Sequence, residues 1–102
     1  MKIELHAIIA ADSMGDGWQD QMQAAKAFAT FVNDTWREQL EANYMDYEIE
    51  VEVKVDPVYS LDVSIEAPDF ETAQDIEMLL NRQNDLWEKW CGSDAAKQFE
   101  KE

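Results

Sequence analysis

The nine residues from Tyr47 to Val55 constrain the fold most, because they alternate strictly between two kinds of side chain. They read Tyr-Glu-Ile-Glu-Val-Glu-Val-Lys-Val. Successive side chains of a β-strand point to opposite faces of the sheet, so this strand would have one apolar face and one charged face. The alternation predicts a sheet with helices on one side and water on the other. The side chains facing water would be Glu48, Glu50, Glu52 and Lys54.

Two further stretches have strand character. Residues 3–10 alternate weakly and end in an apolar run, which is typical of a strand at the centre of a sheet. Residues 61–67 alternate clearly and follow a turn at Pro57. If residues 47–55 and 61–67 form a hairpin, the shortest plausible loop pairs them so that their residue numbers sum to 116. The expected pairs are Val55 with Leu61, Val53 with Val63, Val51 with Ile65, Lys54 with Asp62, Glu52 with Ser64, and Glu50 with Glu66.

The strongest periodic signal predicts a long helix from about Gly17 to about Asn43. Apolar residues recur there in steps of three and four, from Trp18 to Leu40. Asp16 is the expected N-cap, because a glutamine follows it three residues later. The opposite face of this helix carries Asp20, Asp34, Glu38 and Glu41.

A second helix is expected after Pro68. Asp69 is the predicted N-cap, and an apolar stripe runs from Phe70 to Trp90, with Gly92 at the C-terminal end. Ser93 can cap one further short helix over residues 94–99.

The order of these elements predicts an α+β fold. A chain of 102 residues fits a single domain spanning residues 1–102, with the order β-α-β-β-α and a short C-terminal helix. We expect a three-stranded antiparallel or mixed sheet with both long helices on one face, as in a ferredoxin-like fold that lacks its last strand. The third strand would then lie between the first two, and sequential strand order is the alternative.

The net charge limits the partners of the chain. Twenty-three Asp and Glu residues against eight Lys and Arg residues give a net charge of −15. Such a surface repels nucleic acid and anionic membranes and attracts basic protein surfaces, although solubility alone is an alternative explanation. The single cysteine, Cys91, and the lack of a signal peptide or membrane span predict a cytoplasmic protein.

No residue pattern indicates an enzyme, a metal site or a cofactor site. A calcium-like loop at residues 12–17 has Met14 where an oxygen ligand is needed. His6 has no nucleophile near it in sequence, and Glu50 and Glu66 on an open sheet lack a cleft. An RNA-binding sheet would need aromatic and basic residues where this chain has glutamates. The four tryptophans are expected in the core, and the best candidates for exposed contact residues are Trp90 and Tyr59.

The spacing of the acidic residues suggests a function. Carboxylates two residues apart on a strand lie ~6.8 Å apart. Neighbouring phosphates on one DNA strand are separated by roughly 6 to 7 Å. With its acidic strands Glu48–Glu52 and Asp62–Glu66, its small size and its acidic helix backs, the chain resembles the phage-encoded acidic DNA-mimic inhibitors of host defence, the anti-CRISPR and anti-restriction proteins.

This resemblance implies a non-enzymatic inhibitor, monomeric or homodimeric, acting in the host cytoplasm. Its partner would be the basic nucleic-acid-binding surface of a CRISPR effector or a restriction enzyme. The alternatives are an immunity protein or antitoxin that neutralises a basic toxin, and an oligomeric structural or regulatory module that pairs through a sheet edge. The expected partner-binding residues are Glu4, Asp34, Glu38, Glu41, Glu48, Glu50, Glu52, Asp62 and Glu66.

Overall fold

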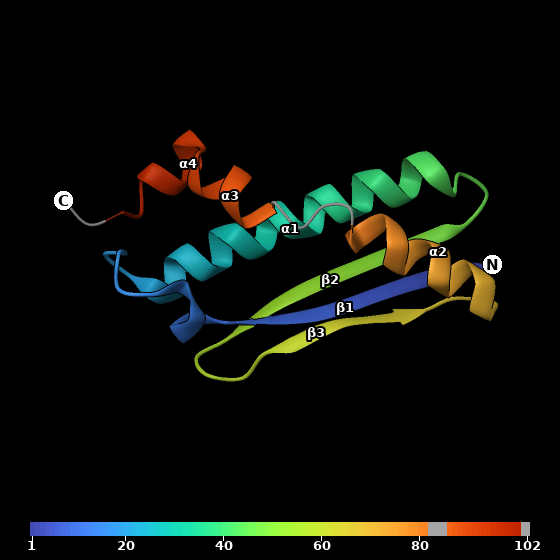
Figure 1. The fold of residues 1–102 in the computed structure, drawn as a ribbon, viewed down its shortest axis with the longest axis horizontal. Helices are drawn as coiled ribbons and strands as arrows, with labels where there is room; N and C mark the ends of the chain where they lie inside the picture. Colours follow the sequence, from blue (N-terminus) through green and yellow to red (C-terminus); the bar gives the residue numbers. More distant parts are fainter. Residues whose placement is uncertain (82–85, 101–102) are drawn as a thin grey trace.

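The protein has two layers, a three-stranded sheet and a set of helices packed against one of its faces (Figure 1). This computed structural model describes residues 1–81 and 86–100, with the side chains of Asp62 and Asn81 left out. The elements in chain order are β1 (Lys2–Ala10), η1 (Ala11–Met14), α1 (Gln21–Asn43), β2 (Glu48–Asp56), β3 (Leu61–Glu66), α2 (Phe70–Asn81), α3 (Leu86–Cys91) and α4 (Asp94–Lys97).

The sheet is mixed, and β1 is its central strand. The strand order is β2-β1-β3, with β1 parallel to β2 and antiparallel to β3. The α+β fold, the helices on one face and the central position of the first strand are therefore confirmed. Both expected strand orders are wrong, because β3 lies neither between β1 and β2 nor beside β2. The expected cross-strand pairs between β2 and β3 are wrong for the same reason.

The connection from β2 to β3 explains this order. Residues 57–60 carry the chain past the end of β1, and the Pro57 carbonyl accepts a hydrogen bond from the Asp12 backbone N–H at 3.2 Å. Asp12 lies in η1, which follows β1 directly, so this contact holds the connection near the end of the central strand. Alternation fixes which face of a strand is buried. It does not fix which strand lies beside it, because each of the three strands has one apolar face.

Helix α1 begins later than the sequence predicts. Its N-cap is Asp20, whose Oδ1 accepts hydrogen bonds from the backbone N–H groups of Met22 at 3.0 Å and Gln23 at 3.2 Å. The prediction that Asp16 caps the helix is wrong. The chain first forms the 3-10 turn η1 and then Gly15, whose φ of 87° favours glycine, so the helix starts only after this turn.

The C-terminal helices follow the predicted caps. The Asp69 carboxylate accepts the Thr72 N–H at 2.8 Å, and the Ser93 hydroxyl accepts the Ala96 N–H at 3.4 Å, so both predicted N-caps are confirmed. The expected helix from Phe70 to Trp90 is described as α2 and α3, and residues 82–85 lie outside the described residues. Helix α4 ends at Lys97, two residues before the expected end.

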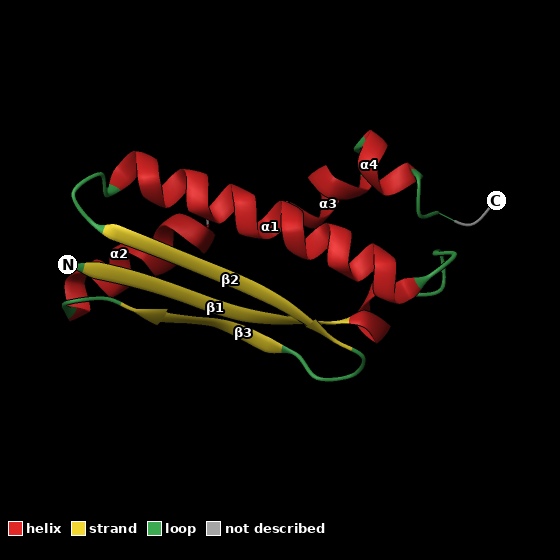
Figure 2. Ribbon diagram, turned by 180° about the vertical axis from the view of Figure 1, so that it is seen from behind, coloured by secondary structure: helices red, strands yellow, loops and turns green. Residues whose placement is uncertain are grey.

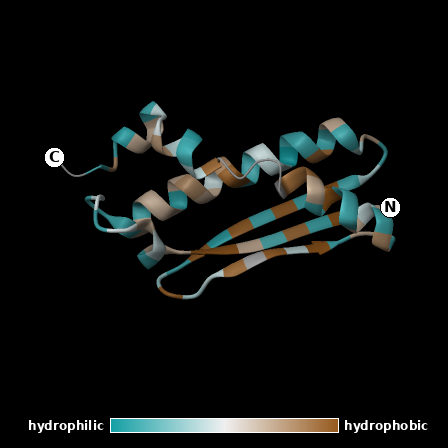
Figure 3. Ribbon diagram, in the orientation of Figure 1, coloured by the Kyte–Doolittle hydropathy of each residue, from teal (hydrophilic) through white to brown (hydrophobic). Residues whose placement is uncertain are grey.

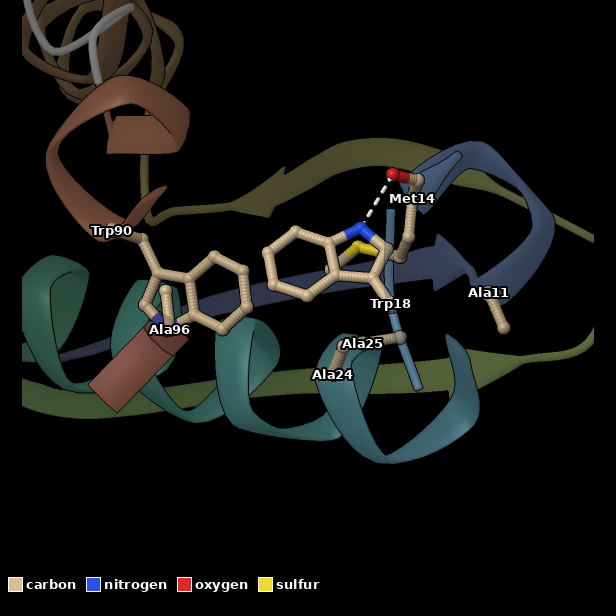
Figure 4. Packing of buried hydrophobic residues seen from close by; sticks show 7 residues of the cluster. All are labelled: Ala11, Met14, Trp18, Ala24, Ala25, Trp90 and Ala96. Carbon is tan, nitrogen blue, oxygen red and sulfur yellow. Dashed lines mark hydrogen bonds between the residues drawn. The ribbon is translucent and has the colours of Figure 1, made fainter. Parts of the chain in front are cut away.

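Two apolar clusters hold the layers together. One cluster lies between the sheet and α1 and α2, and the other joins η1 and the first half of α1 to α3 and α4 (Figure 4). In the second cluster the Trp18 indole N–H donates to the Met14 carbonyl at 2.7 Å, and the Trp18 and Trp90 rings lie 5.1 Å apart. Trp90 is 1% exposed, so its prediction as an exposed contact residue is wrong. Tyr59 is exposed, as predicted.

Among the described elements, no helix packs against the opposite face of the sheet (Figure 1 and Figure 2). Figure 2 shows the molecule from behind, with the three strands in front of α2 and with α1 running along one side. The molecule is elongated, measuring 46 × 25 × 19 Å. Within the part of the chain that the structure describes, no helix combines the length and apolar character that crossing a membrane requires.

Candidate functional site: the acidic face of the sheet

The sheet face that points away from the helices, here called the outer face, collects most of the predicted binding residues. The alternating hydrophilic and hydrophobic bands along the strands in Figure 3 follow the two faces. The described charged and polar side chains of the outer face are Lys2, Glu4 and His6 of β1, Glu48, Glu50, Glu52 and Lys54 of β2, and Ser64 and Glu66 of β3. Asp62 lies in β3, but its side chain is outside the description.

Three glutamates form a row across the sheet. Glu4 on the central strand is paired with Glu50 of β2 on one side and Glu66 of β3 on the other. The sequence predicted that Glu50 and Glu66 would be direct neighbours, which is wrong because β1 lies between them. Glu4 fills the intervening position, so the structure has two adjacent like-charge pairs where one was expected. Like charges in opposed positions of neighbouring strands cost stability.

Hydrogen bonding keeps the central carboxylate of this row ionised. The carboxyl of Glu50 contributes most, followed by that of Glu66 and then by the Lys2 ammonium, and together they lower the pKa of Glu4 to about 2. The low pKa of Glu4 means that this carboxylate keeps its charge well below neutral pH.

The lysines of the outer face are already paired with glutamates. The Lys2 Nζ lies 3.2 Å from Glu4 Oε1 and 3.4 Å from Glu50 Oε2. The Lys54 Nζ lies 3.3 Å from Glu52 Oε1 on the same strand. The expected pairing of Lys54 with Asp62 is wrong, because β2 and β3 are not neighbours. Five described carboxylates against these two lysines leave the outer face with a net negative charge.

His6 lies within this acidic surface. Its Nδ1 is 3.6 Å from Glu52 Oε2, and the possible ligand atoms of Glu4, His6 and Glu50 all lie within 4.8 Å of one another. A nitrogen and two oxygens of this kind can bind a divalent cation. The Lys2 ammonium contacts both glutamates, however, so a metal ion would have to displace it. The sequence analysis found no nucleophile near His6 and did not predict its contact with Glu52.

The predicted residues on α1 lie on another side of the molecule. Asp34, Glu38 and Glu41 are exposed, whereas Val32 and Leu40 of the same helix are buried. Helix α1 packs on the face of the sheet opposite the outer face (Figure 1). These three carboxylates, here called the helix back, belong to this helix and are therefore not part of the outer face. The structure therefore divides the predicted site into two acidic surfaces.

A partly exposed apolar residue at the start of β3 was missed by the sequence analysis. The pairing of β1 with β3 shifts between His6 and Ile8, and this bulge places Leu61 opposite Ile8. Leu61 was predicted in the core next to Val63, but it is 39% exposed. Strict alternation cannot reveal a bulge, because one extra residue reverses the faces of the residues beyond it.

A groove of about 790 Å³ opens between the helices and the sheet, away from the acidic residues of the outer face. Its lining is mainly apolar and includes Phe28, Val32 and Trp87. Glu77 is the one acidic residue among its described lining residues, which include neither a histidine nor a cysteine.

The fold and the outer face define a small α+β protein with an acidic sheet surface that none of the described helices covers (Figure 2). No protein-family model, no curated protein sequence and no solved structure matches the chain.

Proposed function

We propose that the protein is an acidic inhibitor that binds the basic nucleic-acid-binding surface of a host defence protein, a CRISPR effector or a restriction enzyme, and blocks DNA binding by charge mimicry. The row formed by Glu50, Glu4 and Glu66 carries this proposal. Three carboxyl groups are adjacent across three neighbouring strands, and Lys2, which contacts two of them, offsets only part of their charge. A surface that concentrates acidic groups in this way is well suited to a partner that supplies positive charge.

The backbone supports the mimicry. Glu48, Glu50 and Glu52 stand at alternate positions of β2, which places them ~6.8 Å apart, close to the spacing of DNA phosphates. The hydrogen bonds between β2 and β1 hold these positions. A preorganised surface loses little conformational entropy on binding, in contrast to a disordered acidic tail.

The positions of the two acidic surfaces favour a partner whose binding surface is a groove and not a flat face. The outer face and the helix back lie on different sides of a molecule whose two shorter dimensions are 25 and 19 Å. A narrow body with carboxylates on two sides can face both walls of a basic cleft. Association of this kind should be fast and should weaken strongly as salt screens the charges.

A pair of matched triple variants tests the proposal. One variant, E4Q/E50Q/E66Q, neutralises the row, and the other, D34N/E38Q/E41Q, neutralises the helix back, so that each changes the net charge from −15 to −12. Binding to purified CRISPR effectors and restriction enzymes, and DNA binding by these proteins, would be measured from about 50 to about 500 mM salt. We expect the row variant to bind at least about tenfold more weakly, with a shallower salt dependence.

Equal losses in the two variants would mean that total charge, and not its placement, determines binding. Binding that both variants retain, or that does not change with salt, would refute charge mimicry. A loss confined to the helix-back variant would move the docking surface from the sheet to α1. Thermal unfolding of each variant controls for loss of fold.

A further inference from the structure

The outer face carries the glutamate row near one end of its strands, and an exposed apolar loop lies at the other end, where β2 leads into β3. Ile8 lies opposite Leu61 there, after the bulge, and the adjoining loop carries two exposed apolar side chains. Val58 is 74% exposed and Tyr59 is 55% exposed. The glutamate row lies near the other end of the same strands.

Local hydrogen bonds order this exposed loop. The Asp56 Oδ1 accepts the backbone N–H groups of Val58 at 3.0 Å and Tyr59 at 2.8 Å. These two bonds, that of Tyr59 first, lower the pKa of Asp56, so its carboxylate is the form that holds the loop. The Pro57 carbonyl binds the Asp12 N–H on the other side of the turn. Ordering the loop in the free protein reduces the entropy lost when its side chains are immobilised by a partner.

We infer that Val58, Tyr59 and Leu61, here called the apolar anchor, insert into an apolar pocket at the end of the partner's basic groove. The inference rests on the proposed function, because it assigns the anchor to the same partner as the acidic face. A partner that covers both surfaces must combine basic and apolar regions. A second copy of this chain fits poorly, because its own outer face is acidic and would repel the first.

The two parts of this composite surface have different physical roles. Opposite charges accelerate association and are screened by salt, whereas a desolvated aromatic residue slows dissociation and is far less sensitive to moderate salt. The anchor therefore sets the lifetime of the complex, and the glutamates set its rate of formation. The two contributions can be separated by kinetics.

The test compares V58S/Y59S with M45S in binding to whichever purified CRISPR effector or restriction enzyme of the panel binds the wild-type protein. Met45 is a matched control because it is 84% exposed and lies before β2, whereas the anchor loop follows β2. For V58S/Y59S we expect at least about tenfold weaker binding, mainly through faster dissociation, with an unchanged salt slope. M45S should bind like the wild type. Because all three substituted side chains are exposed, melting curves should stay close to that of the wild type.

Each other outcome overturns the inference in a recognisable way. Unchanged binding of V58S/Y59S, while E4Q/E50Q/E66Q binds weakly, would exclude the anchor and leave the charge mimicry standing. Equal losses for V58S/Y59S and M45S would show a nonspecific apolar effect. A changed salt slope in V58S/Y59S would assign the loop to electrostatic binding. If no panel member binds the wild-type protein, both the inference and the proposed function fail.

Discussion

The pKa of Glu4 offers a direct test of the carboxylate row. The usual pKa of this side chain is 4.5, and the structure lowers it to about 2. At pH 3 a group with a pKa of about 2 is roughly 90% ionised, whereas one with the usual value is roughly 3% ionised. Carboxyl-carbon NMR titration of the wild-type protein resolves a difference of this size without reaching the midpoint itself.

Removing the groups that lower the pKa of Glu4 should raise this pKa, and the groups with the largest effect should raise it most. Replacing both Glu50 and Glu66 by alanine removes the two groups that lower the pKa of Glu4 most, so this pKa should move most of the way towards 4.5. Lys2→Ala removes the group with the third-largest effect and should raise the pKa of Glu4 less. Glu38→Ala on the helix back is the control and should leave the Glu4 titration unchanged. The row would be refuted if Glu4 in the wild-type protein were as protonated at pH 3 as a carboxyl group with the usual pKa of 4.5.

The same shift predicts how stability depends on pH. A carboxyl whose pKa is lower in the folded than in the unfolded state stabilises the fold above its unfolded pKa. The contribution of Glu4 should therefore be present in full above about pH 4.5 and disappear as the pH falls towards 2. Urea unfolding over this range should show a steeper loss of stability in the wild-type protein than in the Glu4→Gln variant. Parallel pH profiles would contradict this expectation.

Three further predictions concern the framework of the site. Trp90→Ala should reduce the free energy of unfolding by about 3–5 kcal/mol, because it removes a buried ring packed against Trp18, and a loss below about 1 kcal/mol in urea titrations would contradict the packing. Asp20→Ala should reduce the free energy of unfolding by about 1 kcal/mol, because it removes the N-cap of α1, and should lower the melting temperature by about 4–8 °C. Asp16→Ala, at the position that does not cap the helix, is the control and should have little effect. Burial, and secondarily the charge of Glu100, raises the pKa of the Cys91 thiol, so Cys91 should react with iodoacetamide at pH 7.5 more slowly than an unstructured peptide thiol; an equal rate would show an exposed thiolate.

Much of the framework could be predicted from local chemistry. The alternation of β2 and β3 identified them as strands, and the steps of three and four identified α1, because these periods follow directly from backbone geometry. The caps at Asp69 and Ser93 were predicted correctly, since each bonds a backbone N–H three residues away. The start of α1 was not predicted correctly, because both Asp16 and Asp20 are suitable caps and the turn at Gly15 decides between them.

The sequence by itself therefore determined the fold class, the two faces of the sheet and the acidic character of the outer face. Only the tertiary structure placed β1 between β2 and β3, and with it Glu4 between Glu50 and Glu66. It also separated the helix back from the outer face and left Leu61 partly exposed beside the bulge. The physical reason is that periodicity fixes the direction of a side chain relative to its own strand or helix, whereas the neighbour across the sheet depends on how the whole chain packs.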